Sequence, residues 1–498
     1  MTAYLISMAT YVGFFMILAL ALNLQWGMTG MVNFGIAGFY ALGAYTSGLL
    51  TTKAGWPVGL AMPMAAVTGM AAGALVALLS IRLREDFLAV VTLGFGEIVR
   101  RIALKGGVAT LAVALAAPGI VRAAETINVG SLTPNTGGGG PFGPKITASH
   151  KRVADLVNGQ GGVLGRQINL TQENSETNPE PAVRAADKLI NVNGVIAILG
   201  TWSSSVTLGI MPKCQDAGVI QMCTSSSADI PLRDEKGLVF NFQAPSPVWG
   251  RAIANLALRR GFKSFNLMAL NNDFTRSMMD GFVEIVGRDA LLIDPFYYNG
   301  GQSSYRSEVS QLIAGDPEAV FIPSYVTDFT SVYKELYRQG YEGQVITVSI
   351  STGSKFKDAM GEAANGIIHG LPVPPISSPA YDEYVVEAGL EVTDGVQHPF
   401  GTAGRDQMST LLLAIEAAGT TDTAKVAKAI WEVTTGAGKK TVTNVSDGLA
   451  AIRAGEAINY SGASSSVEFD AEGMVLGRDF QLAEIKDGKD VVIERLAF

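Results

Sequence analysis

The sequence predicts a two-lobed α/β protein preceded by about three transmembrane α-helices. Two observations lead to this prediction. Residues 1–52 and 54–81 contain no Asp, Glu, Lys or Arg, which is typical of helices that cross a bilayer. After Glu125, apolar runs of strand length alternate with amphipathic helical patterns, which is typical of parallel strands joined by crossover helices. The 498-residue chain has room for both parts.

The apolar region contains three segments long enough to span a bilayer as helices, at residues 4–24, 28–50 and 57–81. A fourth apolar segment, residues 87–99, is short for a span. It is flanked by a cluster of basic residues, Arg82, Arg84, Arg100, Arg101 and Lys105. Because basic residues favour the cytoplasmic side, we expect the third span to run inward and the N-terminus to lie outside.

The junction between the two parts, residues 100–124, has the layout of an export signal. Residues 99–105, Val-Arg-Arg-Ile-Ala-Leu-Lys, resemble a twin-arginine translocation motif, and an apolar run follows at residues 108–121. Small residues at Val121 and Ala123 suit cleavage after Ala123. The alternative is a fourth membrane helix. Both interpretations place the residues after Glu125 outside the cytoplasm.

Charge and composition exclude several classes of function. The net charge is −8 and no basic patch stands out, so we expect no nucleic-acid partner. The three histidines, His150, His369 and His398, show neither metal-ligand spacing nor a recognisable Ser/His/acid spacing. We therefore expect no metal, no cofactor and no enzymatic activity. Whether Cys214 and Cys223 form a disulfide stays open.

The soluble region is predicted to form two lobes that the chain visits in turn. Strand and helix patterns alternate from Ile127 to Cys223 and start again after Val239–Gln243. Two Pro-containing stretches, Ala244–Pro247 and Leu371–Pro375, suit stiff crossovers between the lobes. We assign residues 125–244 and 376–450 to lobe 1 and residues 245–375 and 451–498 to lobe 2, with terminal strands at 466–470 and 477–485.

Two serine clusters follow strands of lobe 1. Residues 200–205, Gly-Thr-Trp-Ser-Ser-Ser, end the third predicted strand, and residues 223–227, Cys-Thr-Ser-Ser-Ser, end the fourth. Ligands of open α/β sheets bind beyond the carboxyl ends of strands. The first cluster also opens the helix predicted over residues 204–217, whose free N–H groups favour an anion. A carboxylate could be held here without a basic side chain; the alternative is that the serines only cap helices.

The four consecutive glycines at residues 137–140 follow the first strand of lobe 1. No Gly-Lys-Ser or Gly-Lys-Thr follows them, so we interpret them as a pliable loop rather than a phosphate-binding loop.

These features together resemble known transport proteins. Residues 125–498 resemble the type 1 periplasmic solute-binding proteins, in particular the branch that serves branched-chain amino-acid ABC transporters. The resemblance is carried by the two serine clusters, the two lobes and the export signal. Residues 1–100 resemble the permease of the same transporters, at Leu24-Gln25-Trp26-Gly27, Asn33-Phe34-Gly35, Leu42-Gly43-Ala44-Tyr45 and the run from Leu83 to Val99. The resemblance implies two Rossmann-like lobes joined by hinge crossovers.

The resemblance also implies a set of ligand contacts between the lobes. Ser204 and Ser227 would contribute hydroxyls to a ligand carboxylate, and Ser225 mainly its backbone carbonyl. The apolar part of the ligand would be covered by Phe142 from lobe 1 and by Phe274 and Tyr325 from lobe 2. For Trp202 and Trp249 we expect core packing.

One position departs from the pattern of the family. Its amino-acid binders carry an acidic residue after a lobe 2 strand, which pairs with the ligand ammonium. Counting back from Gly361 and Gly366 places Ser349 there. Because a hydroxyl cannot neutralise a buried ammonium, we expect a carboxylate or amide with an apolar or aromatic body. Asp273 and Asp328 are either substitutes for the missing acid or residues that start helices.

The resulting hypothesis is a solute-binding component of an ABC importer, which binds a small carboxylate, an amide or an amino acid. Its partners would be permease and ATPase subunits, and its N-terminal helices would hold it in the inner membrane with the binding domain outside. Cleavage after Ala123 would release a free periplasmic receptor. The alternative is a tethered receptor fused to a functional permease subunit. Whether the junction is natural or arose by deletion or assembly error stays open.

Overall fold

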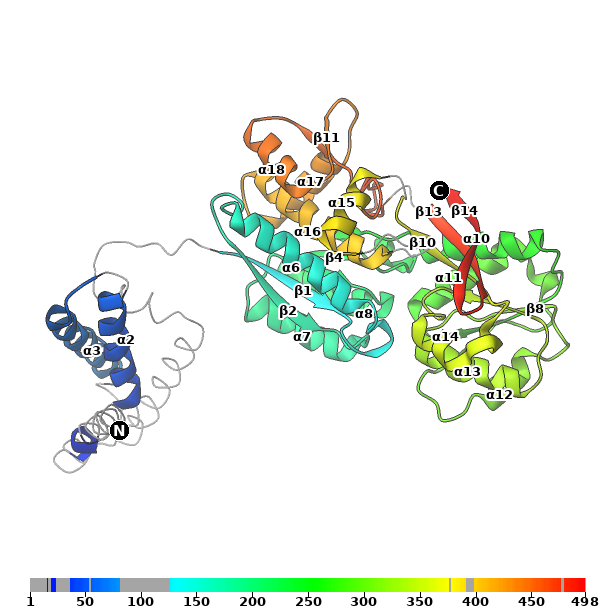
Figure 1. Cartoon of the computed structure of the whole chain (residues 1–498), viewed down its shortest axis with the longest axis horizontal. Helices are drawn as coiled ribbons and strands as arrows, with labels where there is room; N and C mark the ends of the chain where they lie inside the picture. Colours follow the sequence, from blue (N-terminus) through cyan, green and yellow to red (C-terminus); the bar gives the residue numbers. More distant parts are fainter. Residues whose placement is uncertain are drawn as a thin grey trace. The chain divides into compact units, whose positions relative to one another are not determined.

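The computed structural model describes residues 16, 19–23, 36–52, 55–80, 126–375, 378–390, 398–475 and 479–497. The chain divides into two units, residues 1–123 and 124–498, and each is described here by itself (Figure 1).

The first unit contains two helices that pack against each other, α2 (Ile36–Thr52) and α3 (Val58–Ser80). A buried hydrogen bond of 3.2 Å joins them, from the Thr68 hydroxyl to the Thr46 hydroxyl. In the part of the chain that the structure describes, no helix combines the length and the apolarity needed to cross a membrane. The three membrane spans therefore stay a prediction. The segment at 87–99 and the export signal at 100–124 lie outside the described residues.

Lobe 1 is built on a parallel five-stranded sheet in the order β2-β1-β3-β4-β5. Its strands are β1 (Ile127–Thr133), β2 (Ile168–Asn174), β3 (Ala197–Thr201), β4 (Ile220–Cys223) and β5 (Val239–Asn241). The connecting helices are α6 (Gly143–Gly159), α7 (Pro179–Asn191), α8 (Ser204–Ala217) and the short α9 (Asp229–Leu232). A 3₁₀ turn over Gly137–Gly139 precedes α6.

A later stretch of the chain completes lobe 1 (Figure 1). It contains α16 (Pro399–Ala418), α17 (Thr423–Thr434), α18 (Val445–Arg453) and a two-stranded sheet of β11 (Lys440–Val442) and β12 (Ile458–Tyr460). Helix α16 packs against α6, and the buried His150 of α6 hydrogen-bonds both Ser131 of β1 (2.8 Å) and Gln407 of α16 (3.0 Å).

Lobe 2 is built on a seven-stranded sheet in the order β14-β13-β10-β9-β8-β6-β7. The parallel strands are β6 (Phe265–Leu270), β7 (Phe296–Tyr298), β8 (Ala319–Phe321), β9 (Gln344–Val348) and β10 (Ile368–Val373). An antiparallel hairpin of β13 (Asp479–Lys486) and β14 (Lys489–Ala497) adds to β10. The helices are α10 (Ser246–Arg259), α11 (Asp273–Val286), α12 (Arg306–Leu312), α13 (Val326–Arg338) and α14 (Ser354–Met360), with 3₁₀ turns at Arg288–Ala290 and Gly361–Ala364.

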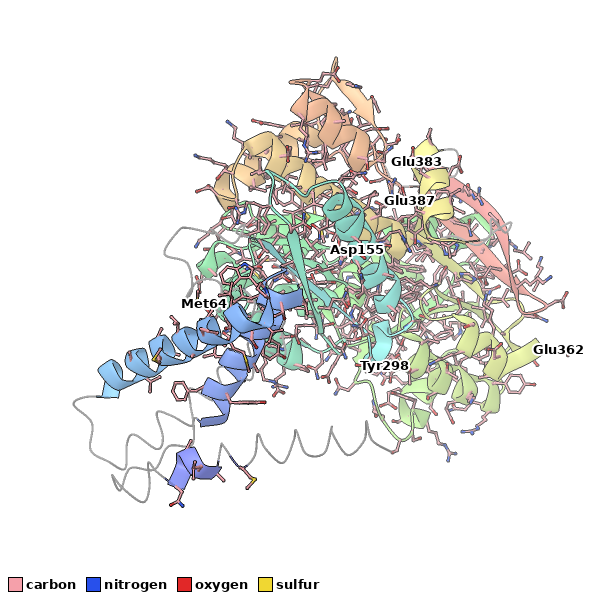
Figure 2. The ribbon with its side chains drawn as sticks, turned by 60° about the vertical axis from the view of Figure 1, so that its left-hand side comes forward. Met64, Asp155, Tyr298, Glu362, Glu383 and Glu387 are labelled. Carbon is pink, nitrogen blue, oxygen red and sulfur yellow. The ribbon has the colours of Figure 1, made fainter. Side chains whose placement is uncertain are left out.

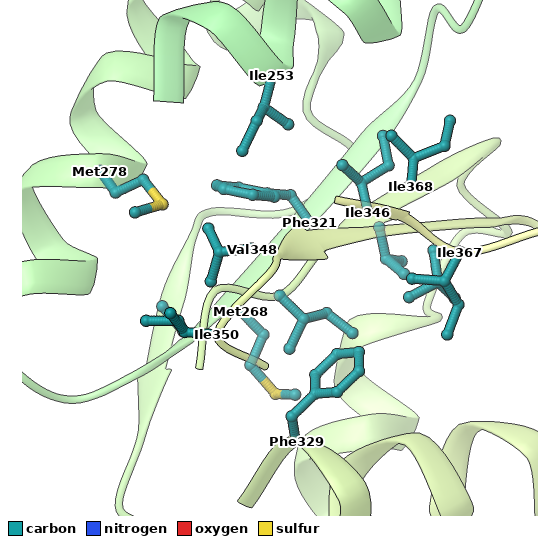
Figure 3. Close-up of a cluster of buried hydrophobic side chains, with 14 of the residues drawn as sticks. Ile253, Met268, Met278, Phe321, Phe329, Ile346, Val348, Ile350, Ile367 and Ile368 are labelled. Atoms are coloured by element: carbon teal, nitrogen blue, oxygen red, sulfur yellow. The ribbon is translucent and has the colours of Figure 1, made fainter. Parts of the chain in front are cut away.

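The core of lobe 2 lies on both faces of its sheet. Figure 3 shows Ile253 and Met278, from α10 and α11, on one side of the strands and Phe329 of α13 on the other. All three side chains are fully buried. Buried aliphatic residues of the strands, such as Ile346, fill the space between the helices. A sheet covered on both faces explains why the strand sequences are apolar runs without alternation.

Helix α15 (Pro379–Glu387) follows the crossover after β10 and is tied to lobe 1 by ion pairs. Figure 2 labels its Glu383 and Glu387. The buried Arg405 of α16 donates two hydrogen bonds of 3.0 Å to Glu387 and one of 3.1 Å to Glu383. A guanidinium that meets a carboxylate through two parallel bonds fixes the orientation of both groups. The Arg405 pairs therefore fix α15 on α16.

The chain crosses back to lobe 2 for the last time well after residue 451, where the sequence predicted the boundary. Phe469 and Val475 are buried in the core of lobe 1, and Met474 pairs with Asn241 at the edge of its sheet. The described residues up to 475 therefore belong with lobe 1. The strand expected at 466–470 is absent from the structure except for an isolated bridge between Phe469 and Val475.

Local chemistry accounts for where several helices begin and end. Helix α7 starts with Pro179, and the side chain of the preceding Asn178 accepts the N–H of Glu180. Helix α8 ends at Gly218, which adopts φ = 66°. A residue without Cβ takes this left-handed conformation at little cost, so the chain can leave α8 directly into β4.

Candidate functional site

The strand orders of the two sheets define where a ligand would bind. In lobe 1 the order reverses between β1 and β3, and in lobe 2 between β6 and β8. In open α/β sheets, a crevice forms at such a switch point beyond the carboxyl ends of the strands. The loops at these points carry Phe142 and Ser204 in lobe 1 and Phe274 and Tyr325 in lobe 2. The topology therefore brings predicted site residues of both lobes to corresponding positions.

The N-terminus of α8 lies at the lobe 1 switch point. Its first residue is Ser204, and the preceding Ser203 is extended and makes no side-chain cap hydrogen bond. The Ser204 hydroxyl instead accepts the N–H groups of Ser226 (3.3 Å) and Ser227 (3.1 Å). This pair of bonds joins the two serine clusters. The first turn of α8 is thus left without a side-chain cap, as an anion site requires.

The other two predicted serines make structural hydrogen bonds. The hydroxyls of Ser225 and Thr207 share a hydrogen bond of 2.5 Å, and the Ser225 carbonyl accepts the side-chain N–H of Asn241. The Ser227 hydroxyl accepts the N–H of Asp229 at 3.2 Å and pairs with Ser277 of lobe 2 at 3.3 Å. Both hydroxyls are fully buried. In this structure Ser227 therefore joins the two lobes and starts α9.

Aromatic rings from both lobes meet between the switch points. Phe142 stacks on Trp202 with centroids 5.4 Å apart and lies 4.8 Å from Phe400. Tyr325 of lobe 2 lies 5.1 Å from Trp202. Phe274 packs edge-on against Trp249 at 5.3 Å. Trp202 packs in the hydrophobic core, as expected, at the place where the two lobes touch.

The Tyr325 ring is held in place on several sides. Burial raises the pKa of Tyr325 to about 12, although the nearby Ser203 hydroxyl of lobe 1 opposes this shift. The phenol is thus neutral at physiological pH. A Cβ added at Gly138 of lobe 1 would lie 2.6 Å from the ring atom Cδ2, so only glycine permits this approach between the lobes. The glycine run at 137–140 therefore has a packing role.

A small cavity is enclosed by this aromatic cluster. Measured by where the centre of a water-sized sphere can go, its volume is about 10 Å³, room for about one water. No charged side chain lines it among the residues that the structure describes. The lining residues are Trp202, Thr224, Ser226, Gln243, Trp249, Phe274, Tyr325, Ile350 and Phe400. A ligand of amino-acid size therefore requires the lobes to separate.

Sequence reasoning missed several of these residues. Thr224 lies in the second serine cluster, and its Oγ1 is buried without a hydrogen-bond partner among the described residues. The choice between neighbouring hydroxyl residues depends on which way each side chain turns after β4, which the sequence does not reveal. Phe400 lies in the first turn of α16, far along the chain from the switch points, and no local signal marks it. Trp249 is buried in the hydrophobic core, as expected, and it also lines the cavity.

Ser349 directly follows β9. It does not line the small cavity described above, nor a second, larger cavity between the lobes that is described below. Its hydroxyl hydrogen-bonds Nδ1 of His369 at 2.6 Å, and Nε2 of His369 lies 3.0 Å from the Asp490 carboxylate. Lys357 pairs with the same carboxylate at 2.7 Å. Burial raises the pKa of Asp490, but the His369 hydrogen bond and the Lys357 charge outweigh it and hold that pKa at about 2. Ser349 is therefore anchored to β10 and the β13–β14 hairpin.

Ser349, His369 and Asp490 form a Ser/His/acid chain whose members show no recognisable spacing in the sequence. Sequence spacing could not reveal it, because Asp490 is 121 residues from His369. The nitrogens are reversed relative to a serine hydrolase, in which Nε2 meets the serine and Nδ1 meets the acid. Because an ionised carboxylate only accepts, Asp490 accepts the hydrogen bond of Nε2–H, and the Ser349 hydroxyl pairs with Nδ1.

The two aspartates considered as substitutes for the missing acid differ in their surroundings. The Asp328 carboxylate accepts the N–H of Gly301 (2.8 Å) and the hydroxyl of Tyr305 (2.7 Å), so it is committed within lobe 2. Asp273 is half-buried in the first turn of α11, and its charge contributes to the raised pKa of Tyr325. Of the two, only Asp273 lies within electrostatic reach of the aromatic cluster.

The two cysteines, whose pairing the sequence left open, are both free and buried. Burial raises the pKa of each thiol to about 12.

Comparison with known proteins bears on both parts of the chain. The family described as periplasmic binding protein matches residues 126–490. A leucine-binding protein from Thermotoga maritima superposes with a TM-score of 0.62 at 19% identity, covering 74% of this chain and 99% of that one. A solute-binding protein from R. palustris, solved in complex with benzoate, gives a TM-score of 0.59 at 18% identity, covering 74% and 96%. At these identities the two structures establish the fold alone.

The N-terminal part matches a different family, described as the permease component of the branched-chain amino acid transport system, over residues 4–126. The high-affinity branched-chain amino acid permease protein LivM of Salmonella typhimurium is 44% identical over 99 residues. That match covers 20% of this chain and 23% of LivM, so the chain spans about a quarter of the length of this relative.

Proposed function

Because the chain belongs to the periplasmic binding protein family over residues 126–490, we propose that it is the extracytoplasmic solute-binding component of an ABC importer. Proteins of this family bind small ligands and work with ABC transporter permeases; they form a class of binding proteins rather than enzymes. The proposed ligand is a small carboxylate or amino-acid-like molecule, bound between the two lobes.

The observation that carries this proposal is the coincidence of three features at the two switch points. Aromatic side chains from both lobes line a cavity, and the first turn of α8 has no side-chain cap. The buried Thr224 hydroxyl has no hydrogen-bond partner among the residues that the structure describes. Buried polar groups normally have hydrogen-bond partners. A ligand carboxylate that accepts from Thr224 and the α8 N–H groups would satisfy them.

The lining favours a ligand whose body is apolar and uncharged. Trp202 and Tyr325 contribute aromatic rings to the lining, and no charged side chain among the described residues lines the cavity. The benzoate-bound relative is consistent with a carboxylate of this kind. An α-amino acid would need a partner for its ammonium, and Asp273 is the acid within electrostatic reach. The leucine-binding relative makes amino acids the second ligand class to test.

Binding is proposed to close the two lobes around the ligand. Contacts between the lobes, such as Ser227 to Ser277 and Trp202 to Tyr325, would stabilise the closed form. The segments that join the lobes are the hinge, in the manner of other two-lobed binding proteins. The closed form would then be recognised by permease and ATPase subunits carried by other chains.

The N-terminal part supports a second candidate function, a receptor tethered to a functional permease subunit. The match to the permease family favours it, whereas its coverage of about a quarter of LivM favours a membrane anchor. We therefore place the binding lobes outside the cytoplasm, tethered at the inner membrane or free in the periplasm after cleavage following Ala123. Solute uptake by vesicles that contain this chain as the only permease subunit would support the second candidate.

The test is isothermal titration of the purified full chain with benzoate, leucine and isoleucine. The Thr224→Val variant should weaken carboxylate binding by about 10- to 100-fold, because a hydrogen bond to a charged group is lost. Thr441→Val, at an exposed position of β11, serves as the matched control and should bind normally. Absence of heat with every ligand would refute the solute-binding role, and equal affinity of both variants would refute the Thr224 contact.

A further inference from the structure

A second cavity opens between the lobes, beside the aromatic cluster. Its volume is about 470 Å³, large enough for part of a small ligand. Residues from the Gly-rich loop and the start of α6 form the lobe 1 wall, and residues near the starts of α13 and α14 form the lobe 2 wall. We call it the mouth groove; it is lined by Asn135, Thr136, Gly137, Gly140, Pro141, Phe142, Lys145, Val326, Ile350, Gly353, Ser354 and Lys355.

The mouth groove carries positive charge on both walls. Lys145 comes from lobe 1 and Lys355 from lobe 2, and the lining contains no acidic residue in the part of the chain described. Within those residues, neither lysine is in a salt bridge, although many other lysines are paired. Lys145 also lies in the first turn of α6, where no acidic residue offsets the positive end of the helix dipole.

The groove adjoins the enclosed cavity. Ile350 lines both spaces, and Phe142 lines the groove while stacking on Trp202, which lines the cavity. Tyr325 and the next residue, Val326, line the cavity and the groove respectively. Aromatic side chains thus lie between an uncharged space and a neighbouring cationic space. A ligand that displaced Phe142 or Tyr325 would occupy both.

We propose that the mouth groove binds an anionic group of the ligand, held between Lys145 and Lys355. This inference rests on the proposed solute-binding function and narrows its ligand class. The preferred ligand is a dicarboxylate or a similar dianion with an apolar body. One anionic end lies at the start of α8 with Thr224, the body lies among the aromatic rings, and the second anionic end lies in the groove.

The two lysines also couple ligand charge to closure. They lie on opposite lobes, so closing the cleft brings two positive charges to the walls of one groove. Like charges that approach each other without a counter-charge oppose the closed form. An anion between them reverses the sign of the interaction, so a dianion would favour closure more than a monoanion of the same shape. The effect should weaken as salt is added, because both lysines are exposed.

The experiment compares matched acids on the purified full chain by isothermal titration. The pairs are benzoate with terephthalate and hexanoate with adipate, and leucine and isoleucine are titrated alongside. We expect the dicarboxylate of at least one pair to bind at least about tenfold more tightly than its monocarboxylate partner. The double variant Lys145→Met, Lys355→Met should lose this preference, whereas Lys425→Met, at an exposed lysine of α17, should keep it.

The outcomes separate this inference from the function on which it rests. Equal or tighter binding of the monocarboxylates, or a preference that survives in the double variant, overturns the inference. Binding of leucine or isoleucine with no heat from any of the four acids overturns it too, and leaves the solute-binding function standing. No heat from any of the six compounds overturns both.

Discussion

Gly138 offers a direct test of how the two lobes meet. A methyl group at this position would lie 2.6 Å from Cδ2 and 3.0 Å from Cγ of Tyr325, on the opposite lobe. Ordinary contacts of this kind are longer than 3.4 Å, so the ring or the loop must move by nearly 1 Å. The ring cannot move easily, because it is buried and packs on Trp202. Overpacking of this kind costs about 1–3 kcal/mol.

The cost of Gly138→Ala falls on the closed form alone, because the contact joins the lobes. The apparent dissociation constant of a ligand that requires closure should therefore rise by about 5- to 150-fold. The thermal midpoint of the ligand-free chain should change by less than about 2 °C, since the open form has no clash. The backbone of Gly138 is outside the left-handed region, so alanine adds no local strain.

The assay is isothermal titration of the full chain with its tightest ligand, beside thermal unfolding without ligand. Gly159→Ala is the matched control: Gly159 is exposed at the end of α6, lines neither cavity between the lobes, and a Cβ there would meet nothing within 4 Å. An unchanged affinity for Gly138→Ala would refute the reasoning that ligand binding closes the lobes to the arrangement seen here. A large loss of thermal stability in Gly138→Ala without ligand would show that the approach of Gly138 to Tyr325 already stabilises the ligand-free chain.

Three further predictions concern stability and thiol chemistry. Burial lowers the pKa of His150 from 6.5 to about 4, so the unfolded chain binds a proton that the folded chain rejects between these values. The free energy of unfolding should thus fall by about 3 kcal/mol as pH drops from 6.5 to 4. Urea titrations at each pH should show a smaller fall for His150→Gln. Parallel curves of unfolding free energy against pH for the two proteins would contradict this. Arg405→Met should lower the free energy of unfolding by about 2 kcal/mol. This is less than the loss of a fully buried pair, because the two glutamate partners on α15 are about a third exposed. An unchanged urea midpoint would argue against this prediction. Cys214 and Cys223 should resist a thiol reagent in the native chain and both react after denaturation, because both are buried and free; rapid native labelling, or fewer than two thiols after denaturation, would disprove it.

Elements with strong local signals were predicted from the sequence. Helix α8 has the predicted bounds, 204–217, because its apolar run starts directly after a serine. The alternation of strand-length apolar runs with helical patterns is also a local signal, and it correctly predicted the parallel strands of both sheets. The hairpin of β13 and β14 is held by pairing with β10, which is distant in sequence. Residues 451–475 belong to lobe 1 because they pack into its core, again through contacts distant in sequence. No local pattern encodes such contacts.

The candidate site shows the same division. Phe274 and Tyr325 line the enclosed cavity and Phe142 lines the mouth groove, because loops at switch points must face the other lobe. Ser349 turns to His369 instead, a partner that only the pairing of β9 with β10 brings near. Which hydroxyl of a cluster is left without a partner, as for Thr224, depends on side-chain packing. The ligand contacts of all seven predicted residues stay a prediction.

The most direct test of the central claim is a crystal structure of the chain grown with its tightest-binding carboxylate. The account predicts ligand density between Trp202 and Tyr325, with one carboxylate at the start of α8 beside Thr224. Density elsewhere, for example in the outer groove of lobe 2 that is lined by Tyr337 and Tyr341, would contradict the account. So would an unoccupied space between the lobes at saturating ligand.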